Sequence, residues 1–395
     1  MHRRLTAAAP ISRGTHLARL AAGWRGESDS AHGASFAAAP PSLRRRLARR
    51  SNGENGDRWT GIAGAGFDRS RVSELAARFA ATLPQRATVV LARDERPAHA
   101  ALLPAAAEAL RRAGSNVLHL GEALEPAVRF AVRSEQADGA LWLAAPNFAA
   151  SAAGLRVIGP GGRPLTSGEQ AGVLSRSPRV DRHFGAERPC GAAAEYDASL
   201  WPAFRTLTAL RITLASPSRA VQTAFERLFA VLPDDLQTVA VPHNATDEQI
   251  GERLAPRPAD LRFYVDGAGV RCRVFDAVGS ERPWAAVIRD LAADAVPQRR
   301  RPASVPEIAV ADRLADSLRL KIAAIGGRVT AVADEPAALW AAVDEGCALA
   351  VGSDGFAVFP TPHGPSADAA RVCAALMRVA SMHRPGDDRV GRVDS

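Results

Sequence analysis

A small set of polar side chains lies in segments that are expected to be loops. They are Arg93, Arg96, Asn147, Arg271 and Ser353. Guanidinium and amide groups donate strong hydrogen bonds to phosphate or carboxylate oxygens, so these residues are candidate ligands for an anion. In the alternative interpretation, the run Arg-Asp-Glu-Arg that begins at Arg93 pairs internally as a loop network. The sequence favours this internal pairing for its two arginines.

The elements expected to position these side chains alternate between strands and helices. Short runs rich in apolar and β-branched residues at 87–92, 116–120 and 139–144 predict buried strands, because they are too short for helices. Apolar residues at helical spacing predict intervening helices at 99–113 and 125–134. This alternation is typical of βαβ units and a largely parallel sheet.

The pattern of strand and helix restarts twice along the chain. We therefore expect three α/β domains at 57–190, 191–298 and 303–384. The Arg- and Ala-rich segment 1–56 and the polar tail 385–395 are expected to be disordered extensions. A preceding helix is expected to have Ser70 as its N-cap.

The composition indicates a cytoplasmic protein without a membrane anchor. Its formal charge is +8, but Lys321 is the only lysine, so the charge reflects arginine usage and gives little support for nucleic-acid binding. The basic run 44–50 is the one segment that could contact nucleic acid. The four cysteines form no CxxC pair, and no apolar run approaches the ~18 residues that span a membrane.

Five segments resemble the signature motifs of the α-D-phosphohexomutases, the family of phosphoglucomutases and phosphomannomutases. In chain order they are Gly61-Ile-Ala-Gly64, Ala92-Arg-Asp-Glu-Arg-Pro97, the stretch 137–159, the stretch 259–271 and Val351-Gly-Ser-Asp-Gly-Phe356. In the family the third of these carries a reactive serine, in Thr-Ala-Ser-His-Asn-Pro. The fourth carries the metal aspartates, in Asp-Gly-Asp-Ala-Asp-Arg.

The resemblance implies an α/β protein of three consecutive phosphohexomutase-like domains with mixed, largely parallel sheets. In the family, the first domain supplies a phosphoserine, the second holds Mg²⁺ with three aspartates and the third contacts the sugar hydroxyls. A fourth domain, which we do not expect here, grips the substrate phosphate. The family moves a phosphoryl group between the 1- and 6-positions of a hexose.

The position of the family's phosphoserine is occupied by Pro146. Proline has neither a hydroxyl to phosphorylate nor a backbone N–H to donate to a phosphate. Asn147 replaces the adjacent histidine of the motif, which removes a possible general acid or base. Ser151 lies five residues downstream and is an alternative phosphate acceptor, although a plain loop serine is the simpler interpretation.

The metal motif keeps Asp266 as its only aspartate, because Ala268 and Val270 stand where carboxylates are usual. Mg²⁺ needs oxygen ligands in octahedral geometry, so we expect its site to be lost and no cofactor to be bound. A hairpin turn is the simpler role for this glycine-containing segment. Ser353 and Phe356 likewise replace the glutamate and histidine of the sugar-binding motif.

These replacements predict a catalytically inactive relative of the phosphohexomutases, with a binding or regulatory role in carbohydrate metabolism. A hexose phosphate or a protein is the expected partner. The alternative is an active intramolecular phosphotransferase with residual or altered sugar-phosphate activity, so whether the protein is an enzyme stays open at this point.

Overall fold

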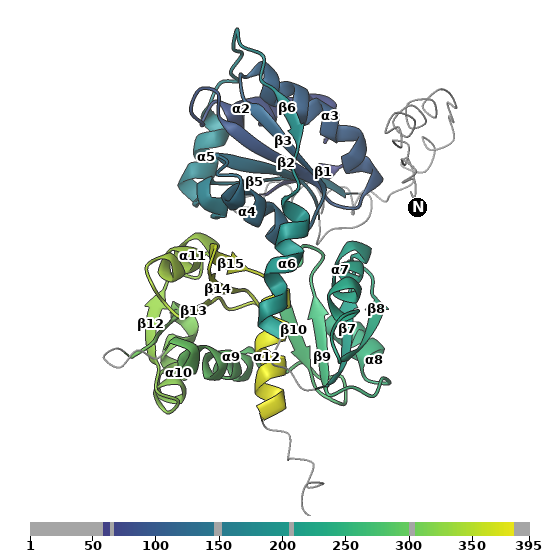
Figure 1. The fold of residues 1–395 in the computed structure, drawn as a ribbon, viewed down its shortest axis with the longest axis vertical. Coiled ribbons are helices and arrows are strands. Elements are labelled where there is room, and N and C mark those ends of the chain that lie inside the picture. The colour runs from purple at the N-terminus through teal and green to yellow at the C-terminus, as the bar shows by residue number, and fades with distance from the viewer. Residues whose placement is uncertain (1–57, 64–66, 146–151, 205–208, 300–304, 383–395) are drawn as a thin grey trace, which may run out of the picture. The chain divides into compact units, whose positions relative to one another are not determined.

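A computed structural model describes residues 58–63, 67–145, 152–204, 209–299 and 305–382 (Figure 1). The chain divides into two units, 1–50 and 51–395, and everything described below belongs to the second. Three mixed, largely parallel sheets confirm the predicted fold class. The predicted extensions at 1–56 and 385–395 lie outside the described residues, and the domain boundaries stay a prediction.

The first sheet has the strand order β1-β5-β4-β2-β3-β6. Its strands are β1 (Arg58–Ile62), β2 (Thr88–Arg93), β3 (Asn116–Glu122), β4 (Gly139–Leu143), β5 (Ala152–Ile158) and β6 (Glu187–Pro189). Its helices are α2 (Arg69–Ala80), α3 (Pro97–Arg112), α4 (Glu125–Ser134), α5 (Ser167–Ser175) and the short 3-10 helix η2 (Pro160–Gly162). β2 pairs in parallel with β3 and β4, whereas β5 runs antiparallel to β4 and β1.

The central strand β2 is apolar from Val89 to Ala92 because helices cover both faces of its sheet. Val89 and Leu91 pack with side chains of α2 and α3. Val90 and Ala92 belong to a second cluster, together with side chains of α4. Successive residues of a strand point to opposite faces, so a strand buried on both sides reads as a continuous apolar run.

Helix α2 begins earlier than its sequence suggested. The extended residue before it is Asp68, whose side chain accepts a hydrogen bond from the Arg71 backbone N–H at 2.9 Å. The prediction that Ser70 is the N-cap is therefore wrong, since Ser70 already lies within the helix. Aspartate is as good a cap as serine, and the sequence alone offered both.

Replacing Asp68 by alanine should lower the free energy of unfolding by about 1 kcal/mol, because a backbone N–H of the first turn loses its acceptor. Ser70→Ala is the matched control, since Ser70 is exposed and does not cap the helix. Urea unfolding of the two variants tests the assignment. An equal loss in both variants would contradict it.

The second sheet has the order β10-β9-β7-β8 and the third has the order β12-β11-β13-β14-β15. The second contains β7 (Arg211–Ser216), β8 (Asp235–Ala240), β9 (Leu261–Val265) and β10 (Cys272–Phe275), with helices α7 (Arg219–Phe229) and α8 (Asp247–Leu254). The third contains β11 (Glu307–Ala311), β12 (Arg328–Val332), β13 (Leu349–Val351), β14 (Ala357–Thr361) and β15 (Gly364–Ala367). Helices α9 (Trp284–Arg299), α10 (Asp312–Ala323), α11 (Pro336–Asp344) and α12 (Ala369–Met382) complete the described part.

One hydrophobic core runs through all three sheets. A single cluster of buried side chains includes Val90 of the first sheet, Phe263 of the second and Val310 of the third. The helix α6 (Ala192–Phe204) follows β6 and packs against α4 and α12 (Figure 1). Arg299, the first residue after the second predicted domain, is the last residue of α9, and residues 300–302 lie outside the described residues.

Candidate functional site

Side chains from the turn after β2 and from the first turn of α3 bond the residues that flank the segment 146–151. The Asp94 carboxylate accepts the Ala145 backbone N–H at 3.2 Å, on the near side of the segment. On its far side, the Arg96 guanidinium donates to the Ala152 carbonyl at 3.0 Å, and His99 Nε2 accepts the Gly154 N–H at 3.0 Å. We call these three side chains, Asp94, Arg96 and His99, the loop clamp.

The loop clamp is buried and internally bonded. His99 Nδ1 hydrogen-bonds Asp94 Oδ1, and because Nε2 accepts from a backbone N–H, the neutral ring must carry its proton on Nδ1. Burial raises the pKa of the Asp94 carboxyl, but hydrogen bonds from His99 and from the Arg96 backbone, with the Arg96 charge, bring that pKa below its usual value. Asp94 is therefore a fixed anion.

The two arginines of this turn have different surroundings. Arg96 is buried, lies 3.5 Å from Asp94 Oδ2, and desolvation lowers its pKa. Arg93 is partly exposed and pairs with Glu122 at the end of β3 at 3.0 Å. Arg96 is thus paired within the run, and Arg93 both donates to the Asp94 carbonyl at 2.8 Å and reaches a neighbouring strand through Glu122. Glu95 reaches the start of α7, beside the second sheet, where it accepts the Arg219 N–H at 3.1 Å.

The segment that resembles the metal motif is a tight turn between β9 and β10. Asp266 is buried, and its Oδ1 accepts the N–H groups of Val270 at 2.9 Å and Arg271 at 3.1 Å. Gly269 has φ of 75°, a conformation that favours glycine. The predicted hairpin turn is confirmed, because the two strands pair antiparallel across it.

The replaced positions of this turn are part of the hydrophobic core. Ala268 is 0% exposed and Val270 3% exposed, and both belong to the cluster that joins the three sheets. The Ala268 carbonyl accepts the Glu125 N–H at 3.3 Å, and the Gly269 carbonyl accepts the Ala369 N–H at 3.0 Å. Carboxylates would here be removed from water among apolar side chains.

The chemistry of this turn does not fit a magnesium ion. Its one carboxylate already accepts two backbone N–H groups, and its neighbours contribute methyl groups rather than oxygens. Across the described ranges, no three histidine, cysteine, aspartate or glutamate side chains gather closely enough to hold a metal ion.

Arg271 and the segment around Ser353 meet where the second and third sheets adjoin. Arg271 Nε donates to Asp354 Oδ2 at 2.9 Å, and its guanidinium lies 5.8 Å from the centre of the Phe356 ring. The Cys272 N–H also donates to the Gly355 carbonyl at 3.1 Å. The two motifs that the sequence placed about 80 residues apart are therefore in direct contact.

Ser353 is bonded within the loop region of the third sheet. Its hydroxyl donates to Asp334 Oδ2 at 2.6 Å, and its backbone N–H donates to Asp334 Oδ1 at 3.2 Å. Arg313 contacts both side chains and is largely exposed. The structure thus brings Arg271 near Ser353's loop and keeps Arg93 with Arg96, whereas Pro146, Asn147 and Ser151 lie outside the described residues.

Several residues of the site escaped the sequence analysis. Asp94 entered the sequence analysis only within the run that begins at Arg93, while His99, Glu122, Asp334 and Asp354 were not singled out. A spacing of five between Asp94 and His99 is the only local signal, because the backbone groups they bond lie about 50 residues away.

None of the described helices has the length and apolar character needed to cross a membrane.

Comparisons with known proteins agree with this architecture. A family model for the phosphoglucomutase/phosphomannomutase α/β/α domain I matches residues 49–181. A phosphoglucosamine mutase from Synechococcus sp. (strain RCC307) is 28% identical over 338 residues, which cover 79% of this chain and 71% of that protein.

Solved structures show the same fold. A phosphoglucomutase/phosphomannomutase family protein from Burkholderia thailandensis has a TM-score of 0.72 at 18% identity, over 83% of this chain and 77% of its own. A putative phosphomannomutase from Thermus thermophilus has a TM-score of 0.64 at 18% identity, over 83% and 79% of the two chains. Residues 49–181 therefore belong to domain I of the phosphoglucomutase/phosphomannomutase family, and the chain shares the fold of these α-D-phosphohexomutase structures.

Proposed function

We propose that this protein binds a hexose phosphate without transferring its phosphoryl group, and that it acts in carbohydrate metabolism as a binding or regulatory protein. The observation that carries the proposal is the buried turn at 266–271, whose replaced positions belong to the core. Phosphoryl transfer depends on positioned charges that neutralise phosphate oxygens. With Ala268 and Val270 in the core, this turn cannot hold a metal ion for that purpose.

The first sheet and its loops support the same interpretation. Pro146 can neither accept a phosphoryl group nor donate a backbone hydrogen bond. The loop clamp nevertheless keeps both ends of 146–151 in place. Firmly bonded flanks around a segment that has proline at the phosphoserine position suit ligand binding better than group transfer.

Two arginines are available to receive the phosphate group. Arg93 and Arg271 are each about one quarter exposed, and their carboxylate partners, Glu122 and Asp354, are about half exposed. Exposed ion pairs contribute only about 0–1 kcal/mol, so a phosphate can displace these carboxylates at little cost. Arg96 is committed to the loop clamp and would act by positioning.

Hexose phosphates should raise the melting temperature of the purified protein by a few degrees, because a ligand that binds only the native state stabilises it. Glucose 1-phosphate, mannose 1-phosphate and glucosamine 6-phosphate are the probes, the last because the Synechococcus relative is named a phosphoglucosamine mutase. Glucose is the uncharged control. Arg93→Gln with Arg271→Gln should abolish the shift, and Arg253→Gln, at an exposed site on α8, should not.

The same preparation decides between binding and catalysis. With Mg²⁺ and glucose 1,6-bisphosphate present, we expect no interconversion of the 1- and 6-phosphates and no mass increase from a covalent phosphate. Turnover above a buffer control would instead establish the alternative function, an active phosphohexomutase. The absence of any thermal shift would overturn hexose-phosphate binding and leave a protein partner as the remaining candidate.

A further inference from the structure

A second cleft lies beside α6 and α7. It has a volume of about 660 Å³ and is bounded by the turn after β2, the end of β3, α6 and α7. Ligand sites in proteins typically enclose about 300–1,000 Å³. Among the described residues, this cleft is therefore of a size that accommodates a small molecule.

Helix α7 turns one polar face toward this cleft. Arg219, Thr223 and Arg227 follow each other at intervals of four residues, so they share a face of the helix, and all three line the cleft. Both arginine side chains are about two thirds exposed. Their carboxylate contacts are long, at 3.4 Å from Arg219 to Glu226 and 3.3 Å from Arg227 to Asp197.

The acidic residues around the cleft are largely engaged elsewhere. Glu95 accepts the backbone N–H groups of Arg219 at 3.1 Å and Ala220 at 2.5 Å at the start of α7. Glu122 pairs with Arg93 at 3.0 Å. The two guanidinium groups of α7 are thus the charges most free to receive a ligand, and they favour an anion.

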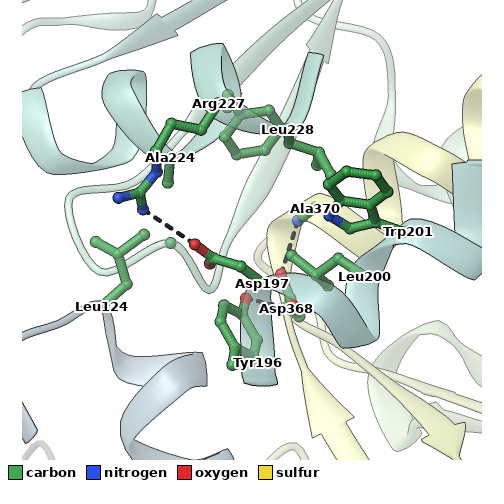
Figure 2. Close-up of a pocket in the computed structure, with 12 residues that line it drawn as sticks. Leu124, Tyr196, Asp197, Leu200, Trp201, Ala224, Arg227, Leu228, Asp368 and Ala370 are labelled. Carbon is green, nitrogen blue, oxygen red and sulfur yellow. Dashed lines mark hydrogen bonds and ion pairs between the residues drawn. The ribbon is translucent and has the colours of Figure 1, made fainter. Parts of the chain in front are cut away.

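An apolar cavity opens beside this polar face. It has a volume of about 100 Å³ and adjoins the larger cleft, with which it shares Leu124, Tyr196, Asp197, Ala224 and Arg227. Its large apolar side chains come from α6 and α7, together with Leu124 (Figure 2). That lining includes Leu200, Trp201, Phe225 and Leu228.

Trp201 leaves part of the apolar lining of this cavity exposed to solvent. It is 41% exposed although it is a large aromatic residue beside other apolar side chains. An engineered apolar cavity of about 150 Å³ holds benzene, so a cavity somewhat smaller and open on one side has room for part of a ring. Figure 2 shows the Arg227–Asp197 pair at the edge of the same space.

We propose that this cleft is a second ligand site, which binds a small molecule that joins a phosphate or similar anion to an aromatic or other apolar group. The anion lies between Arg219 and Arg227 with Thr223 as a hydroxyl donor, and the apolar group enters the cavity beside Trp201. This site uses Arg219 and Arg227 in place of Arg93 and Arg271, and its ligand carries an apolar group in place of a sugar, although Glu122, the partner of Arg93, also lines this cleft.

Phenyl phosphate and inorganic phosphate are the two probes for this site, measured by isothermal titration calorimetry on the full chain. Burying the phenyl ring should make phenyl phosphate bind about tenfold tighter than phosphate. Arg219→Gln with Arg227→Gln should weaken both probes by at least about tenfold, since the charges that hold the anion are gone. Arg253→Gln is the matched control on α8 and should change neither.

Ala224→Leu separates the apolar contribution from the charge. Ala224 lies in both lined spaces, so a larger side chain should remove the advantage of the phenyl ring and leave phosphate binding unchanged. If this variant melts early, the double arginine variant, which alters only exposed side chains, still decides. Equal binding of the two probes, unchanged binding in the double variant, or no binding at millimolar concentration would each overturn the proposal.

Discussion

Replacing Val270 by aspartate should lower the free energy of unfolding by at least about 3 kcal/mol and should not create a magnesium site. Val270 is 3% exposed and belongs to the core that joins the three sheets. The change removes a buried apolar side chain and places a carboxylate in its space. The metal motif has a carboxylate at this position, whereas in this chain the position is a valine that packs in the core.

Val278→Asp is the matched control for this experiment, because Val278 is 77% exposed and lies in the turn that follows β10. Urea unfolding of both variants should be measured with and without MgCl₂. The loss in Val270→Asp should shrink as the pH falls, because burial raises the pKa of a carboxyl and the protonated form is cheaper to bury. Stabilisation of Val270→Asp by Mg²⁺, absent in the control, would show that the turn can still become a metal site.

Much of the strand and helix order could be predicted because burial imposes a simple pattern. The apolar run before Arg93 forms β2, and α4 has the bounds expected from its spacing. Helix α6 was missed although Ala192, Tyr196, Leu200 and Phe204 recur every fourth residue and are all buried. That signal was present in the sequence, and a search for the four-residue period would have found it.

Other features have no local signal. Strands β14 and β15 pair Pro360 with Pro365, and proline is normally a sign against a strand. The partners of the candidate arginines are equally distant, because Glu122 and Asp354 are chosen by the packing of separate elements. Sequence could therefore predict which residues are charged and lie in loops, but not which charges they already balance.

The loop clamp is the clearest case of contact partners that the sequence alone cannot predict. Among single substitutions in the clamp, Asp94→Ala should be the most destabilising. We expect a loss of about 3–5 kcal/mol in the free energy of unfolding, because removing one partner of a buried ion pair leaves the other charge uncompensated. Here that charge is Arg96, whose side chain is only 8% exposed. His99 and the Ala145 N–H also lose their acceptor.

The conservative variant Asp94→Asn isolates the charge from the shape. Asparagine keeps one oxygen acceptor but cannot balance the charge of Arg96. The free energy of unfolding should therefore fall, but by less than in Asp94→Ala. Asp316→Asn is the matched control, because Asp316 is 97% exposed and its change should stay within about 0.5 kcal/mol. If Asp94→Asn unfolded at the same urea concentration as Asp316→Asn, the clamp would have no energetic role.

At low pH, the wild type and Asp94→Asn should have nearly equal free energies of unfolding. The pKa of Asp94 is lowered in the folded protein, so its contribution to stability is fully present above the ordinary aspartate pKa and is lost as the pH falls through the lowered one. Amide hydrogen exchange at Ala145 and Gly154 gives the local readout, since these N–H groups bond Asp94 and His99. Faster exchange there than at the β2 amides, in Asp94→Asn alone, would separate release of the loop from a general loss of stability.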